Sequence, residues 1–224
     1  MSKHLRMDLE RLQDELAAMA AAVEIAVNKA VAALRRRDAA LAREVIDADD
    51  DIDDFQDQIE TECLKLLALH QPVAGDLRRV TTAIRISVDL ERMGDLAEGI
   101  AGRATRLAEL PDFPMPDKLR PMADLTTHMV RLSLDAFYRV DAAQARAICR
   151  QDNDVDRHCA EIVAGLTAAM RAGGSEAVES GLSLFSAVSH LERIADHATN
   201  IAEDVVYLAE GEIVRHHPDL RRGQ

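Results

Sequence analysis

Residues 90–101 read LERMGDLAEGIA, and residues 191–202 read LERIADHATNIA. At an offset of 101 positions the two stretches share seven of twelve residues, including a Glu and an Asp that stand four apart in each copy. Because this offset is nearly half of the 224 residues in the chain, the repeat predicts a tandem duplication of one helical unit.

The composition is typical of long helices packed through small and aliphatic side chains. Hydrophobic residues make up 48% of the chain, but aromatic residues only 3%, and none is Trp. The net charge of −13 argues against nucleic-acid binding, which depends on clusters of Lys and Arg. It favours a protein that attracts cations or basic partner surfaces.

The cysteines and the N-terminus indicate the cellular compartment. Cys63, Cys149 and Cys159 are an odd number of cysteines at no metal-ligand spacing, which is typical of reduced thiols. The N-terminus has no apolar signal core, and there is no run of 18 apolar residues. These features predict a cytoplasmic protein without a membrane-spanning segment.

Apolar residues recur every three or four positions through the first half, which is the period of a helix. The pattern predicts helices over residues 5–35, 38–70 and 73–107. Asp38 is a suitable cap for the second of these helices, and Pro72 explains where it ends.

The second half repeats this plan after residues 111–116 (PDFPMP), whose prolines mark a linker. Asp141 stands 103 positions after Asp38 and is expected to cap the equivalent helix. Gly173-Gly174 should end that helix, and Gly211 should end the last one. The predicted helices of this half cover residues 117–139, 141–172 and 175–210.

The predicted fold class is all-α, with six long helices in two tandemly repeated three-helix bundles. Each helix has an apolar stripe that it cannot bury alone, so the helices of each half must pack together. We expect a first bundle over residues 1–110, a linker over 111–116, a second bundle over 117–214 and a tail over 215–224.

Acidic residues form matched pairs on the predicted outer faces. With Leu90 and Met93 at core positions of a heptad, Glu91 and Asp95 both lie away from the core, on one helix face. The second copy gives the same assignment, and the preceding helix of each half carries a similar pair. The four pairs are Asp49/Asp53, Glu91/Asp95, Asp152/Asp156 and Glu192/Asp196.

The two pairs of each half are expected to meet. In a helical hairpin closed at Pro72, Asp53 and Glu91 each lie 19 residues from the turn, so their pairs come level. Converging carboxylates repel one another by about a few kcal/mol per close contact when solvent screening is partial. A multivalent cation would remove this repulsion, and a ligand set of oxygens suits iron, manganese, magnesium or calcium better than zinc.

Other interpretations of the acidic residues stay open on the pattern alone. A solvated acidic surface explains a single pair well, and it explains four matched pairs about as well as a metal site does. A di-iron oxidase or ferritin-like protein would also be helical, but its site needs inward Glu-x-x-His motifs, and the sequence has none. No catalytic residues are predicted, because no nucleophile–base arrangement and no glycine-rich phosphate loop is present.

The motif LERMGD with its downstream Ala, and the run LERIADHATNIAEDVVYLAEGE at residues 191–212, resemble the PhoU family of regulators of the bacterial phosphate-specific ABC transporter. The resemblance covers nearly the whole chain. It implies that the four E(D)xxxD-type pairs hold multinuclear metal clusters, with iron expected first and manganese, magnesium or zinc as alternatives.

The resemblance also implies a negative regulator without catalytic activity. PhoU-like proteins restrain phosphate uptake and the phosphate-starvation response, through contacts with the transporter's ATPase subunit and a membrane sensor histidine kinase. We therefore expect a homodimer or larger assembly that meets the membrane only through these partners. A structural adaptor without metal is the remaining alternative.

The two motif copies differ in ways that bear on the metal sites. Positions 98 and 99 differ between the copies, which makes metal in the first motif the weaker expectation. Ala195 stands where the first copy has Gly94, an exchange that is expected to be sterically mild. His197 is not expected to be an essential ligand of both sites, because Leu96 replaces it in the first copy.

Overall fold

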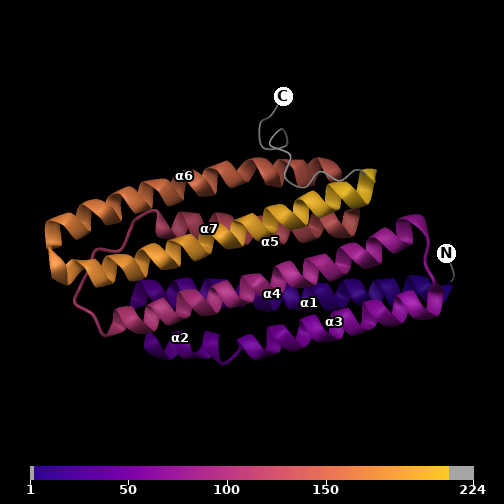
Figure 1. Cartoon of the computed structure of the whole chain (residues 1–224), viewed down its shortest axis with the longest axis horizontal. Coiled ribbons are helices and arrows are strands. Elements are labelled where there is room, and N and C mark those ends of the chain that lie inside the picture. The colour runs from indigo at the N-terminus through magenta and orange to yellow at the C-terminus, as the bar shows by residue number, and fades with distance from the viewer. Residues whose placement is uncertain (1–2, 212–224) are drawn as a thin grey trace.

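The computed structural model describes residues 3–211, and all regular secondary structure in this range is helical (Figure 1). The predicted all-α fold is confirmed. In chain order the helices are α1 (Lys3–Arg36), α2 (Ala39–Ile46), α3 (Asp49–His70), α4 (Ala74–Ala108), α5 (Leu119–Arg139), α6 (Ala142–Gly173) and α7 (Ser175–Glu210).

The helices form two bundles that share one continuous hydrophobic core. Helices α1 to α4 make the first bundle and α5 to α7 the second, with α4 and α7 side by side across the middle and α1 and α5 behind them (Figure 1). Ion pairs from Arg85 to Asp204 and from Arg106 to Glu179 join opposite ends of α4 and α7, so these two helices run antiparallel.

The helix ends follow the local chemistry of the sequence. The Asp38 carboxylate accepts hydrogen bonds from the backbone N–H groups of Ala40 and Leu41, both at 3.0 Å. The Asp141 carboxylate accepts one from Gln144 N–H at 2.9 Å. Each Asp satisfies amides that a helix start leaves without a partner, which confirms the two predicted caps.

The segment between the bundles is held in place from the first bundle. Residues 109–118 contain no helix, and they include the predicted linker. The Arg37 guanidinium donates hydrogen bonds to the carbonyls of Leu110 and Pro111 at 3.0 and 2.8 Å. Phe113 of this segment is buried against the core. The predicted tail over 215–224, and residues 212–214, lie outside the described residues.

One predicted helix is divided in the structure. The continuous helix expected over residues 38–70 is interrupted at Asp47 and Ala48, which separate α2 from α3. Residues 47–54 contain six Asp, which are poor in helix interiors but favourable in a first turn, near the positive end of the helix dipole. The equivalent residues 150–157 contain three Asp and two Arg, and there α6 continues unbroken.

Helix α1 contains a long apolar stretch. Part of its span His4–Arg36 has a mean hydropathy of 1.6, enough by length and composition to cross a membrane. The prediction of no membrane-spanning segment rests on unbroken apolar runs alone, and this stretch is interrupted by charged residues. Half of that stretch is buried in the bundle, where Leu12, Leu16 and Met19 belong to the core, as expected for a central bundle helix.

Candidate metal centre

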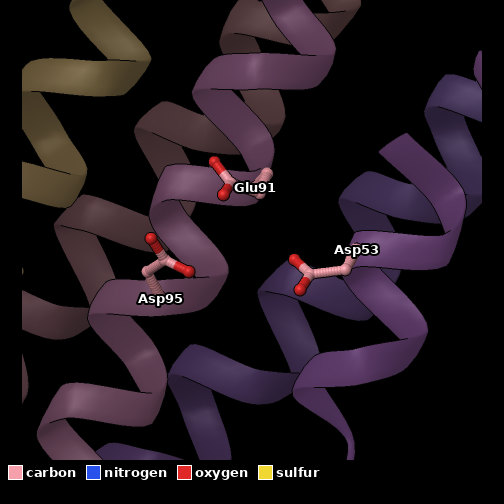
Figure 2. A group of neighbouring side chains, drawn as sticks. All are labelled: Asp53, Glu91 and Asp95. Atoms are coloured by element: carbon pink, nitrogen blue, oxygen red, sulfur yellow. The ribbon is translucent and has the colours of Figure 1, made fainter. Parts of the chain in front are cut away.

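Three carboxylates of the first bundle meet on its surface. Asp53 points from α3 toward Glu91 and Asp95 on α4, and ligand oxygens of the three side chains lie within 4.8 Å of one another (Figure 2). The hairpin between α3 and α4 places them level, as the equal distances from Pro72 predict. Leu90 is fully buried beneath them, so packing fixes the helix faces that carry the acids.

Gly94 brings α3 and α4 close together at this point. A Cβ atom at position 94 would lie 3.0 Å from Asp49 Oδ1 and 3.1 Å from Ile52 Cγ2, tighter than ordinary van der Waals contact. Glycine therefore leaves the space in which the Asp49 carboxylate rests beside α4. An alanine at position 94 would require the Asp49 and Ile52 side chains to move by a few tenths of an ångström.

The carboxylates of the first bundle raise one another's pKa values. Burial, followed by the charges of Glu98, Asp53, Asp95 and Glu91, raises the pKa of Asp49 from 3.8 to about 6. The pKa of Asp53 is raised by burial and then mainly by Asp95. Burial and Asp95 also raise the pKa of Glu91, against a smaller opposite effect of Arg92. The cluster therefore favours uptake of positive charge, as protons or as a cation.

Glu98 was not among the predicted site residues, although its charge has the largest effect of any neighbour on Asp49. The sequence did contain a signal for it: Glu98 follows Asp95 by three residues, so both lie on one face of α4. The equivalent position of the second copy is Thr199. Glu98, the fifth acid of the first bundle, therefore does not belong to a pair that both copies share.

The predicted acids of the second bundle are arranged differently. Asp152 is only 3% exposed, so the expectation that this pair faces outward is wrong for Asp152. Asp152 precedes the core residue Val155 by three positions, so it lies on nearly the same face of α6 and at the edge of the hydrophobic core. Asp156 and Asp196 are exposed. Among the described residues, the three-carboxylate group of the first bundle has no counterpart of similar closeness here.

Cys159 lies beside Glu192, the fourth predicted acid of the second bundle. The thiol donates a hydrogen bond to Glu192 Oε2 at a distance of 3.4 Å. Burial, followed by the charge of Glu192, raises the pKa of this thiol to about 12. Cys159 is therefore protonated at neutral pH and uses the Glu192 carboxylate as its acceptor.

Comparison with known proteins identifies the family. A family model described as the PhoU domain matches residues 16–104 and again residues 119–205. The chain belongs to the PhoU family.

Two proteins named "Phosphate-specific transport system accessory protein PhoU homolog" are similar over almost the whole chain. The one from Pseudomonas aeruginosa is 38% identical over 216 residues (96% of this chain, 89% of that protein). The one from Aquifex aeolicus is 37% identical over 217 residues (97% and 98%).

Solved structures of PhoU proteins have the same fold. The crystal structure of PhoU from Pseudomonas aeruginosa matches with a TM-score of 0.87 at 38% identity, and covers 92% of this chain and 99% of that one. The phosphate transport system regulatory protein PhoU from Streptococcus pneumoniae matches with a TM-score of 0.86 at 31% identity, and covers 94% and 99%. The repeated three-helix plan of this PhoU-family chain is thus confirmed.

A contact between the bundles lies next to the carboxylates of this PhoU-family chain. His197 of α7 reaches α4, where its Nδ1 lies 2.8 Å from Asp89 Oδ1. Asn200 donates a longer hydrogen bond of 3.5 Å to the same oxygen. His197 is also close enough to Glu91 for its charge to lower the pKa of that carboxyl, against the larger effects that raise it, so the second bundle touches the edge of the first carboxylate cluster. Neither Asp89 nor His197 recurs in the other repeat, and the sequence offered no signal for this pair.

The first bundle's acids suit a hard cation, because all their donors are oxygens. Asp53, Glu91 and Asp95 would hold it, with Asp49 and Glu98 adjacent. Such an ion would offset the mutual repulsion of the negative carboxylates, which contributes to their raised pKa values. Metal binding by all eight predicted residues remains a prediction.

The metal-free protein should become less stable as the pH rises from about 4 to about 6, in part because of Asp49. Its pKa is 3.8 in an unfolded chain and about 6 in the fold. In this window the folded state binds the proton more tightly, so the free energy of unfolding falls as the proton leaves. Urea unfolding in the presence of a chelator would measure the fall. Asp49→Asn should reduce it, and an equal fall in both proteins would contradict the assignment.

Proposed function

We propose that this chain is a regulator, and not an enzyme, that restrains phosphate uptake and the phosphate-starvation response from the cytoplasm. The observation that carries the proposal is its similarity, over nearly its whole length, to proteins named as accessory to phosphate-specific transport systems. It would act by contacting the transporter's ATPase subunit and a membrane sensor histidine kinase, as a homodimer or larger assembly.

The surface location of the carboxylates supports a role in structure or assembly for the proposed metal. Asp53 is exposed and Asp95 is partly exposed on the outside of α3 and α4, away from the apolar interior in which a di-iron oxidase would hold its site. We propose a multinuclear metal cluster at this surface, with iron as the first candidate, and a second site at the acids of the other bundle.

Deletion of the gene in its own bacterium tests the regulatory proposal. In phosphate-rich medium, deletion should raise uptake of labelled phosphate and activate a reporter of the starvation response, because the restraint is gone. Returning the wild-type chain should reverse both effects. Uptake and reporter activity that stay at the wild-type level after deletion would overturn the proposal.

A further inference from the structure

A groove of about 420 Å³ lies between α1 and the divided helix α2–α3. Its lining is largely apolar and includes Ala22, Ile25 and Ala26 of α1, and Ile52 and Phe55 of α3. Ile25 is 57% exposed, although large aliphatic side chains are among those most often buried. The groove therefore offers apolar surface that this chain does not cover by itself.

The groove depends on residues that are specific to the first bundle, and not on the helix arrangement that the two bundles share. Small alanines line both walls, at positions 22 and 26 of α1 and at position 48. Position 48 is also where α2 and α3 separate. At an offset of 103 positions, the second bundle has Leu125 in place of Ala22 and Gln151 in place of Ala48. Its α6 is continuous at that point, and the side chains at both positions are larger than alanine.

One wall of the groove is acidic. Glu44, Asp51 and Asp54 line it on the side of α2 and α3, and Lys29 is the only cation in the lining. Lys29 is bound to Glu44 at 3.0 Å. Among the described residues, neither Asp51 nor Asp54 forms an ion pair with a cation. The groove thus combines an apolar floor with uncompensated negative charge along one side.

We propose that this groove binds a basic amphipathic helix of a partner protein. Two neighbouring helices form its walls, and such grooves accept the apolar face of a third helix at i, i+3, i+4 and i+7 spacing. Lys or Arg beside that face would meet Asp51 and Asp54, whose charge favours encounter with a basic partner. A second copy of this chain is a poorer occupant, because it carries a net charge of −13 itself.

Binding of a designed peptide tests this directly. The probe is a fluorescein-labelled helical peptide of 18 residues with Leu on one face and Lys and Arg beside it, and the control peptide has Glu at each basic position. Fluorescence anisotropy should show saturable binding of one basic peptide per chain, and no binding of the acidic peptide. If both peptides bind equally well, or if neither binds, the proposal is wrong.

Matched variants locate the binding site. Ile25→Ser should weaken binding of the basic peptide by at least about fivefold, because it removes a central apolar anchor. Leu182→Ser is the control, because Leu182 is 55% exposed on α7, outside the groove. Asp51→Asn with Asp54→Asn should weaken binding in the same way, whereas Asp50→Asn, in the same turn of α3 but not in the lining, should not. Equal effects of groove and control variants would contradict the site.

Sedimentation of the same proteins tests the competing occupant. If the wild-type chain dimerises and only Ile25→Ser is monomeric, a second copy fills the groove and the proposal of a basic helix is overturned. Equal oligomeric states of wild type and variant support it. Neither measurement involves phosphate transport, so the groove can be rejected without affecting the proposed regulatory function, and the reverse is also true.

Discussion

Replacing Glu91 with Gln and Asp95 with Asn in one chain should abolish binding of the proposed metal by the first bundle without loss of the fold. These residues are two of the three whose ligand oxygens lie within 4.8 Å of one another. Outer-shell partners of metal ligands already contribute about 10- to 100-fold to affinity, so loss of two ligands should weaken binding by more than about 100-fold. Elemental analysis of protein purified without tag or chelator measures the loss.

Stability distinguishes a metal site from a structural role of the same acids. Gln and Asn keep the size of the side chains and remove repulsion between like charges, which costs a helix about 0.2–0.5 kcal/mol per pair. Helical circular dichroism of the metal-free variant should match that of wild type, and its free energy of unfolding should be no lower. A variant that loses helix together with metal would show that the pair is structural.

The second bundle provides the matched comparison. Glu192→Gln with Asp196→Asn alters the equivalent pair, but Glu192 there accepts a hydrogen bond from Cys159. We expect this variant to lose less metal than the variant of the first bundle, because three close carboxylates are assembled only on α3 and α4 within residues 3–211. A larger loss from the second bundle would contradict the order that the structure indicates.

Arg85→Ala should destabilise the packing of the two bundles by about 2 kcal/mol, a little less than the usual cost of breaking a buried ion pair. Arg85 Nη1 of α4 lies 3.2 Å from Asp204 Oδ1 of α7, and the Asp204 side chain is fully buried while Arg85 is half exposed. The guanidinium also lies over the Tyr207 ring, 5.6 Å from its centroid. Removing Arg85 leaves a buried carboxylate with less compensating charge, and urea unfolding measures the cost.

Arg106→Ala is the control for this prediction. Arg106 also joins α4 to α7, through Glu179, but both side chains of that pair are exposed, so its loss should change stability much less. Replacing Arg85 and Asp204 together by Leu should recover much of the stability, because the buried carboxylate is removed together with the guanidinium that compensates it. Equal effects of the Arg85 and Arg106 variants would show that burial of Asp204 is not what makes its ion pair important.

Periodic features of the sequence predicted most of the fold and the meeting of the carboxylates on α3 and α4. The spacing of Leu90 and Met93 determined which way Glu91 and Asp95 face. Equal distances from Pro72 then brought Asp53 level with Glu91. These predictions succeed because helix period and hairpin geometry are local, and they act in the same way wherever the residues occur.

The features that the sequence did not reveal depend on contacts between distant segments. His197 meets Asp89 because α4 and α7 cross antiparallel, and neither residue belongs to a repeated motif. Asp152 is buried because its turn of α6 lies at the edge of the hydrophobic core, whereas heptad positions alone predicted that its side chain faces solvent. The break at Asp47 had a local signal in the run of aspartates, but the continuous apolar stripe on either side concealed it.

The connection between the two halves through residues 109–118 has a consequence for how they diverge. In a symmetric homodimer, every substitution appears twice, so both subunits must tolerate the same change. Here each half has its own stretch of the chain, so a substitution changes one bundle and leaves the other bundle unchanged. The first half can therefore carry the five-acid cluster and the alanine-lined groove while the second keeps Cys159 against Glu192. The fused chain is in effect an obligate heterodimer whose two members are always present in equal amounts.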